Sequence, residues 1–350
     1  MVDVKIKLGK LFFILIIIGA GVYAFFNQPW IERQYDKLCG VYYIHKGDKA
    51  YSHLKLQKAI DYYTQGLRLY PEHYSAWFNL GNIYVVYEDY FSAVDAYEQA
   101  IKNNPKMMIA RMNYGIISAE KLGDFDGAIA QYNEILNTKR HLISIPFIYN
   151  NKKSYKMNKG IAYYNMGLAY RQKALYCGDD YALSRKYMNQ AIDAYKKAIK
   201  IMKKDYDAHY NLALAYHLIG DYNNAGLMYC EAIKYSPMEY DAHYNLAILL
   251  RRMKFYKESL DEMEKATTLI TDKEGASARQ RYIFDVMNDV TRTILSENEK
   301  KYMVDKIDEE RVNTPVTYVN GKLVSSEELD KAIIKNFRTC GAKKLFLDED

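Results

Sequence analysis

The octapeptide YDAHYNLA stands at residues 206–213 and again at residues 240–247. The two copies begin 34 residues apart, at Tyr206 and Tyr240. A fixed period of this length indicates repeated units that stack on one another, because one unit alone cannot bury its apolar face. The octapeptide is therefore predicted to form the first half of the leading helix in two successive units.

Related units extend through residues 40–273 and begin near residues 40, 74, 108, 160, 206 and 240, with the 34-residue step interrupted on both sides of the fourth unit. The unit at 74–107 carries small and large residues at repeat positions 4, 7, 8, 11, 20, 24, 27 and 32, which are Trp77, Leu80, Gly81, Tyr84, Ala93, Tyr97, Ala100 and Pro105. The third unit needs one extra residue between its helices. The fourth unit contains about a dozen extra residues, which are predicted to expand its inter-helix turn at 173–188.

This pattern resembles the tetratricopeptide repeat, which reads W-x2-L-G-x2-Y, then A-x3-F, then P. The resemblance implies an all-α solenoid of about six helix-turn-helix repeats that binds proteins or peptides, without a metal or cofactor. Small residues at positions 8 and 20 let the two helices approach closely, and large residues at positions 4, 7, 11 and 24 fill the space between them. His209 and His243 stand at position 4, so we expect them to pack inside their repeats rather than bind metal.

The N-terminal stretch at residues 11–31 contains no charged residue and follows Lys5, Lys7 and Lys10. About 20 apolar residues cross a bilayer, so residues 11–31 are predicted to be a membrane anchor, with a cytoplasmic tail at 1–10 and a linker at 32–39. By the positive-inside rule the repeats then lie on the far side, in a periplasm. A cleaved signal peptide ending near Ala24 places them on that side too, whereas a cytosol-facing array is the remaining alternative.

The C-terminal part is predicted to hold a capping helix at 274–313, which covers the open end of the solenoid. Residues 314–350 are predicted to form a hairpin that turns at Asn320-Gly321 and a short helix. The four cysteines show no metal-ligand spacing. They are interpreted as buried apolar residues, and a disulfide is the alternative in an oxidising compartment.

The resemblance also implies which side chains line a partner-binding groove, because family positions 2, 5, 9, 12 and 13 of the leading helix commonly do so. The candidates are Phe78, Asn82, Tyr164, Arg171, Tyr210, His217, Tyr244, Arg251 and Arg252. Arginine suits carboxylates, and tyrosine offers apolar contact with a polar tip. We therefore hypothesise capture of an acidic peptide or helix in the C-terminal half. The alternative is a solvated wall with local salt bridges.

A second candidate surface lies in the irregular segment at 137–156, between the third and fourth units. Its basic residues are Lys139, Arg140, Lys152, Lys153 and Lys156. This segment is interpreted either as a solvated linker or as an insert that docks on anionic headgroups or an acidic protein.

Composition and motifs narrow the class of function. The net charge of +6 is mild and is interpreted as spread out, which argues against nucleic acid as a partner. The chain shows no hydrolase, zinc-protease, P-loop or dinucleotide motif, so it is not expected to be an enzyme. The leading interpretation is a membrane-anchored scaffold for an envelope machine of the secretion, pilus, flagellar motor or cell-wall class, with self-association left open. The alternatives are a cytosol-facing receptor or co-chaperone and a lipid-surface targeting protein.

Overall fold

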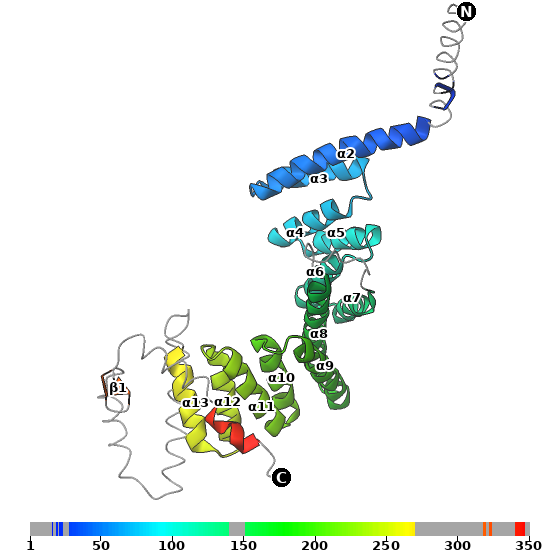
Figure 1. The fold of residues 1–350 in the computed structure, drawn as a ribbon. Helices are drawn as coiled ribbons and strands as arrows, with labels where there is room; N and C mark the ends of the chain where they lie inside the picture. Colours follow the sequence, from blue (N-terminus) through cyan, green and yellow to red (C-terminus); the bar gives the residue numbers. More distant parts are fainter. Residues whose placement is uncertain are drawn as a thin grey trace, which may run out of the picture. The chain divides into compact units, whose positions relative to one another are not determined.

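The chain divides into two units, Met1–Thr138 and Lys139–Asp350, and the described helices of each form pairs joined by short turns (Figure 1). The computed structural model describes residues 28–139, 151–269, 318–319, 322–323 and 340–346, together with residues 16, 19 and 21–23. The predicted all-α solenoid is confirmed for these residues.

The first unit contains three helix pairs. They are α2 (Gln28–Ser52) with α3 (Leu56–Leu69), α4 (Tyr74–Val86) with α5 (Tyr90–Asn103), and α6 (Met108–Glu120) with α7 (Phe125–Asn137). The turn between α6 and α7 is one residue longer than the turn between α4 and α5, which confirms the extra residue expected in the third repeat.

The second unit contains three further pairs. They are α8 (Asn151–Leu175) with α9 (Tyr181–Ile201), α10 (Tyr206–Ile219) with α11 (Tyr222–Tyr235), and α12 (Tyr240–Arg252) with α13 (Tyr256–Leu269). Both copies of YDAHYNLA begin the first helix of a pair, α10 and α12, as predicted.

A tyrosine packed against a glycine closes most of these pairs. Tyr97 is 1% exposed, and a Cβ added to Gly81 would lie 2.7 Å from its ring. The same close approach joins Gly47 to Tyr63, Gly115 to Tyr132, and Gly167 to Tyr195. At these four glycines a larger residue would push the helices apart, and buried Ala213 and Ala247 stand at position 8 of the last two repeats, so the predicted role of small residues there is confirmed.

Aspartates fix where many of the helices begin. Asp89 accepts a hydrogen bond from the backbone N–H of Ser92, and Asp205 accepts one from Ala208. Asp124, Asp180 and Asp221 cap α7, α9 and α11 in the same way. Each cap satisfies a backbone donor that the first helical turn leaves without a partner.

Two predicted boundaries differ from the structure. Residues 32–39 are not a linker, because α2 runs through them without a break. The extra residues of the fourth repeat do not form an expanded turn at 173–188, because α8 and α9 are lengthened to 25 and 21 residues and the turn between them is short. Longer helices keep the backbone N–H and C=O groups of the extra residues hydrogen-bonded, whereas a long loop would leave many of them without a backbone partner.

The chain ends are described only in part. The predicted anchor at 11–31 lies mostly outside the described residues. The predicted capping helix at 274–313 and the short helix expected after the hairpin lie wholly outside them. Of the helices that the structure describes, none is long and apolar enough to span a membrane. The predicted hairpin is present, since β1 (Tyr318–Val319) pairs antiparallel with β2 (Lys322–Leu323).

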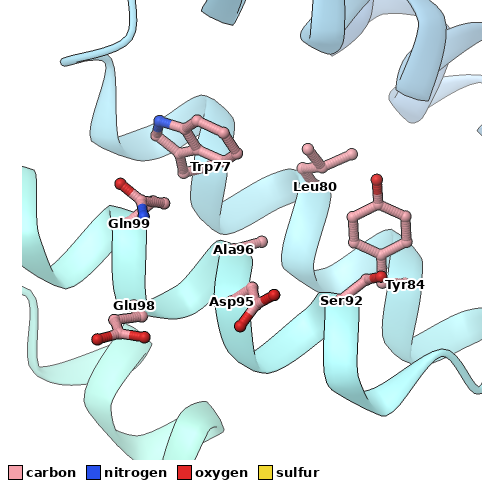
Figure 2. Close-up of a pocket in the computed structure, with 8 residues that line it drawn as sticks. All are labelled: Trp77, Leu80, Tyr84, Ser92, Asp95, Ala96, Glu98 and Gln99. Atoms are coloured by element: carbon pink, nitrogen blue, oxygen red, sulfur yellow. The ribbon is translucent and has the colours of Figure 1, made fainter.

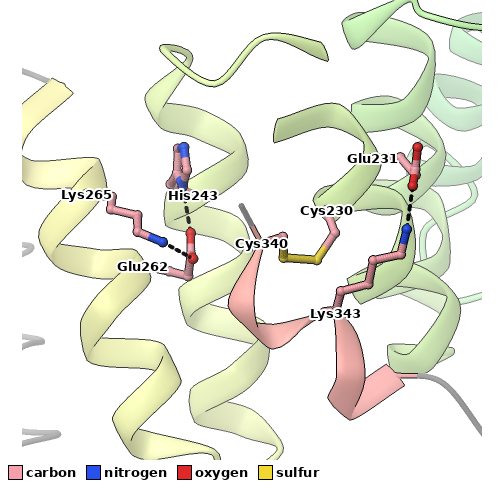
Figure 3. The surroundings of a disulfide bond; sticks show 7 residues. All are labelled: Cys230, Glu231, His243, Glu262, Lys265, Cys340 and Lys343. Carbon is pink, nitrogen blue, oxygen red and sulfur yellow. Dashed lines mark hydrogen bonds and ion pairs between the residues drawn. A yellow bond between two sulfur atoms is a disulfide. The ribbon is translucent and has the colours of Figure 1, made fainter. Parts of the chain in front are cut away.

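A short 3-10 helix, η2 (Gly341–Phe346), packs on α11 and was not predicted (Figure 3). A disulfide joins Cys230 of α11 to Cys340, with their Cα atoms 5.4 Å apart. Lys343 Nζ lies 2.7 Å from Glu231 Oε1, and the ring of Phe346 covers Gly226. The pairing that the sequence left open is therefore Cys230 with Cys340, while Cys39 and Cys177 are free.

Candidate functional site

In the second unit, five side chains from four helices form what we term the donor cluster: Arg171 of α8, Tyr195 of α9, Tyr206 and Tyr210 of α10, and Tyr229 of α11. The rings of Tyr206 and Tyr210 stack with centroids 5.6 Å apart, and those of Tyr210 and Tyr229 lie 6.1 Å apart. The Arg171 guanidinium interacts electrostatically with Tyr195, Tyr210 and Tyr229.

The tyrosine hydroxyls of the cluster all stay protonated at neutral pH. Burial raises the pKa of Tyr210 to about 12, even though the Arg171 charge acts in the opposite direction. Burial raises the pKa of Tyr195, Tyr206 and Tyr229 as well. Each hydroxyl can therefore donate a hydrogen bond, and Arg171 can only donate.

Several of these donors have no acceptor. Arg171 Nε and the hydroxyls of Tyr195 and Tyr206 are buried without a hydrogen-bond partner among the described residues, as is the acceptor Gln190 Oε1. A buried polar atom left unsatisfied costs about 1–3 kcal/mol. The excess of donors fits a ligand that supplies acceptor oxygens, such as a carboxylate.

A repeat of the first unit shows why the Tyr195 hydroxyl lacks a partner. There the Tyr97 hydroxyl donates to Asn82 Oδ1 at 2.8 Å, and Asn113 Nδ2 donates to the same oxygen at 3.2 Å. Leu168 of α8 stands at the repeat position that Asn82 occupies in α4, so the Tyr195 hydroxyl meets no equivalent oxygen.

Some of the predicted groove residues in the second unit pack inside the repeats, and others are exposed to solvent. Tyr164 and Tyr210 accept hydrogen bonds from Asn211 and Asn245 of the following repeat, at 3.1 and 2.9 Å, so they also hold neighbouring repeats in register. Tyr244 is partly buried against the core cluster around Ala247 and Met263.

His217 and Arg252 extend the donor cluster toward the surface. His217 Nδ1 lies 3.4 Å from the Tyr229 hydroxyl, and Arg252 covers the ring of Tyr222 at 5.5 Å. Burial lowers the pKa of His217, and the charge of Arg252 lowers it further. Arg252 is exposed and Arg251 is partly exposed. The structure thus brings Arg171, Tyr210, His217 and Arg252 to one region.

The predicted site residues of the first unit serve its internal packing. Phe78 is partly buried, with its ring 5.8 Å from that of Tyr97, and Asn82 holds the hydrogen bonds described above. A different cleft of about 500 Å³ lies between α4 and α5 (Figure 2). Trp77 and Tyr84 line it together with Asp95 and Glu98, a combination of aromatic and carboxylate groups that suits a cationic side chain.

The basic residues predicted at 137–156 lie only partly within the described chain. Lys139 is exposed after α7, and Arg140 lies outside the described residues. Lys152, Lys153 and Lys156 belong to α8, so they are part of a helix and not of a linker. Lys153 and Lys156 are exposed.

Identical octapeptides place their histidines in different surroundings. His209 Nδ1 lies 2.7 Å from the Asp205 carbonyl oxygen, and its ring packs against Tyr235. His243 is fully buried, with Nδ1 2.6 Å from Glu262 Oε2 and Nε2 3.0 Å from the Pro237 carbonyl oxygen (Figure 3). Packing at position 4 is confirmed for both, and His243 adds a hydrogen bond to Glu262 that the octapeptide itself does not reveal.

Comparison with known proteins identifies the repeats. Tetratricopeptide repeat models match residues 46–86, 88–140 and 206–237, and a further TPR repeat model matches residues 183–220. The chain therefore carries tetratricopeptide repeats, the class of repeat that forms protein-interaction scaffolds.

One curated protein is similar in sequence, and two solved structures are similar in fold. The TPR repeat-containing protein MJ1428 of Methanocaldococcus jannaschii is 26% identical over 205 residues, which are 50% of this chain and 35% of that protein. The crystal structure of a tetratricopeptide repeat protein from Parabacteroides merdae has a TM-score of 0.50 at 16% identity, covering 86% of this chain and 99% of that one. That of PilW, a type IV pilus biogenesis factor, has a TM-score of 0.50 at 13% identity, covering 69% and 97%.

Proposed function

We propose that this protein is a membrane-anchored scaffold whose second unit captures an acidic segment of a partner protein at the donor cluster. The observation that carries the proposal is the set of buried donors without acceptors, Arg171 Nε and the hydroxyls of Tyr195 and Tyr206. An acidic side chain or a C-terminal carboxylate would supply the missing oxygens, and arginine binds a carboxylate through a two-pronged fork. Tyr210 and His217 would contact the rest of the segment.

The location of the scaffold rests on two supports. The uncharged stretch at 11–31 after three lysines favours an anchor with the repeats on the far side of the membrane. The Cys230–Cys340 disulfide favours an oxidising compartment such as a periplasm. A scaffold held there would assemble or stabilise an envelope machine. The identity of the captured partner would show which machine this is.

Selection of peptides from a random display library on the purified protein tests the capture. We expect enrichment of peptides that carry Asp, Glu or a free carboxyl terminus. Arg171→Leu should weaken their binding about 10- to 100-fold, because a hydrogen bond to a charged group contributes about 1.5–3 kcal/mol.

Arg185→Leu is the matched control for that selection, since Arg185 is an exposed arginine of α9 that is not part of the donor cluster. It should bind the selected peptides as the wild type does. Enrichment of basic or neutral peptides, or equal binding by both variants, would show that the donor cluster is not a carboxylate site.

A second candidate function is attachment to an anionic lipid surface, and the distribution of charge favours it. Residues 151–204 contain 13 basic and 3 acidic residues, a formal charge of +10, whereas the whole chain carries +6. The interpretation that the charge is spread out is therefore wrong. Lys197, Lys200, Lys203 and Lys204 are exposed at the end of the α8–α9 pair and form no ion pair among the described residues.

Co-sedimentation with vesicles tests this second candidate, using a version of the chain that begins at Gln28. We expect binding to phosphatidylcholine vesicles that contain phosphatidylglycerol, and its loss as salt rises. Changing Lys197, Lys200, Lys203 and Lys204 to Gln should abolish it, whereas the same change at Lys49, Lys55, Lys58 and Lys102 of the first unit should not. Vesicle binding that is unchanged by salt and by the four changes in the second unit would show that these lysines do not form a lipid-binding surface.

A further inference from the structure

A stripe of large apolar side chains runs along the exposed side of α2. Its members are Ile31, Tyr35, Leu38 and Tyr42, with exposed fractions of 40%, 67%, 70% and 57%. Their spacing of four, three and four residues is that of the a and d positions in a coiled coil. We call these four residues the seam.

No part of the α2–α3 pair can cover the seam. The buried residues of α2 are Gly40, Ile44, Gly47 and Ala50. These face α3, since a Cβ added to Gly40 would lie 2.7 Å from Tyr70 Cβ and one added to Gly47 would lie 2.7 Å from the Tyr63 ring. By helical spacing the seam lies on the other side of α2. Contiguous exposed apolar patches of this kind mark interaction sites.

We propose that the seam pairs with the seam of a second copy of this chain, as a parallel two-helix coiled coil. The direction rests on the proposed membrane anchor. The uncharged stretch at 11–31 runs directly into the seam at Ile31, so two chains anchored in one bilayer would place their α2 helices side by side with the same polarity. The apolar stripe itself does not depend on the anchor.

The residues beside the seam permit this pairing. In a parallel pair in register, the g position of one helix faces the following e position of the other. Gln34 then faces Cys39 of the second copy, and Val41 faces Lys46. No like charges oppose each other at these positions. The stem of Lys46 already covers the ring of Tyr42 at 4.5 Å, so it adds to the apolar surface.

A seam of three turns would be marginal between two free peptides. Here α2 is already folded against α3 from Gly40 onward, so pairing extends a helix that is partly held in place. The two anchors would also hold the helices at a high effective concentration in the membrane. Both effects favour a dimer that forms in the membrane-bound protein and weakens in dilute solution.

Cysteine crosslinking of the full-length protein in its membrane tests the proposal. In a Cys39→Ser, Cys177→Ser background, Leu38→Cys should give a disulfide-linked dimer under mild oxidation, because equivalent d positions meet in a parallel pair. Asp36→Cys, an exposed position outside the seam, should not. Adding Tyr35→Glu to Leu38→Cys should reduce the dimer at least tenfold without shifting the thermal unfolding of the protein, since Tyr35 is exposed.

Three outcomes would overturn the seam pairing. The first is that Leu38→Cys gives no crosslinked dimer. The second is that Asp36→Cys gives as much dimer as Leu38→Cys, and the third is that adding Tyr35→Glu does not reduce the amount of dimer. A stripe that faces lipid would give no dimer, and Leu38→Cys would react slowly with a water-soluble maleimide while the protein is membrane-bound.

Alkaline carbonate extraction of the same membranes separates this proposal from the anchor. Protein that stays in the membrane and fails to crosslink leaves the anchor standing and contradicts the seam. Protein that is extracted yet still crosslinks through Leu38→Cys supports the seam and contradicts the anchor.

Discussion

Glu262→Ala is expected to lower the free energy of unfolding of the second unit by about 3–5 kcal/mol. Glu262 is 2% exposed, and its two carboxylate oxygens lie 2.6 Å from His243 Nδ1 and 2.7 Å from Lys265 Nζ. Without the carboxylate, His243 Nδ1 and Lys265 Nζ both lose the buried oxygens that they contact. Urea unfolding followed by circular dichroism measures the change.

Glu264→Ala is the matched control, because Glu264 lies two residues further along α13 and is exposed. It should change the free energy of unfolding by no more than about 0.5 kcal/mol. Equal effects of the two variants would mean that the buried ion pair contributes nothing specific.

The same carboxylate gives a pH dependence. Burial alone would raise the pKa of Glu262, but the hydrogen bond from His243 and the charge of Lys265 hold it below its usual value. A carboxyl whose folded pKa is lowered stabilises the fold above its unfolded pKa of about 4.3 and loses that contribution as pH falls through the folded pKa. Wild-type stability should therefore fall below about pH 4.3, and Glu262→Ala should lack this part of the fall.

Cys340→Ser is expected to destabilise the second unit by about 2–5 kcal/mol. The disulfide to Cys230 closes a loop with a sequence separation of 110 residues, so breaking it restores much chain entropy to the unfolded state. η2 would then hold to α11 through the Lys343–Glu231 pair and through the packing of Ala342 and Phe346 in the core. Burial alone would raise the pKa of Glu231, but Lys343 and Lys234 hold it below its usual value.

Cys177→Ser provides the comparison for that variant, because Cys177 is a free cysteine in the turn between α8 and α9. It should unfold at nearly the same urea concentration as the wild type. A reducing agent should shift the wild type to the midpoint of Cys340→Ser and leave Cys340→Ser unchanged. If reduction has no effect on the wild type, the disulfide does not support the fold.

The sequence predicts the helix pairs well because their packing is local and periodic. A glycine at position 8 and a tyrosine at position 24 are 16 residues apart in the regular repeats, as Gly81 and Tyr97 are, so the repeat period is enough to bring them together. The sequence assigns the extra residues of the fourth repeat to a turn, whereas they lengthen α8 and α9. The position of an insertion within a repeat does not show whether it extends the helices or the loop between them.

Features that depend on distant residues could not be predicted. The partner of Cys230 lies far along the chain, and the repeat pattern gives no register for η2. His209 and His243 occupy identical octapeptides, and the difference between them comes from Met228 in one repeat and Glu262 in the next. The partner-binding groove around Arg171 stays a prediction, and the buried donors without acceptors depend on how α8, α9 and α10 meet.

In-cell crosslinking followed by purification of the tagged full-length protein tests the donor-cluster proposal most directly. A variant with Arg171, Arg251 and Arg252 changed to Glu is compared with the wild type and with Arg185→Glu. Our account predicts a partner protein that co-purifies with the wild type and with Arg185→Glu and is lost from the triple variant. A partner recovered equally with all three would contradict capture at the donor cluster.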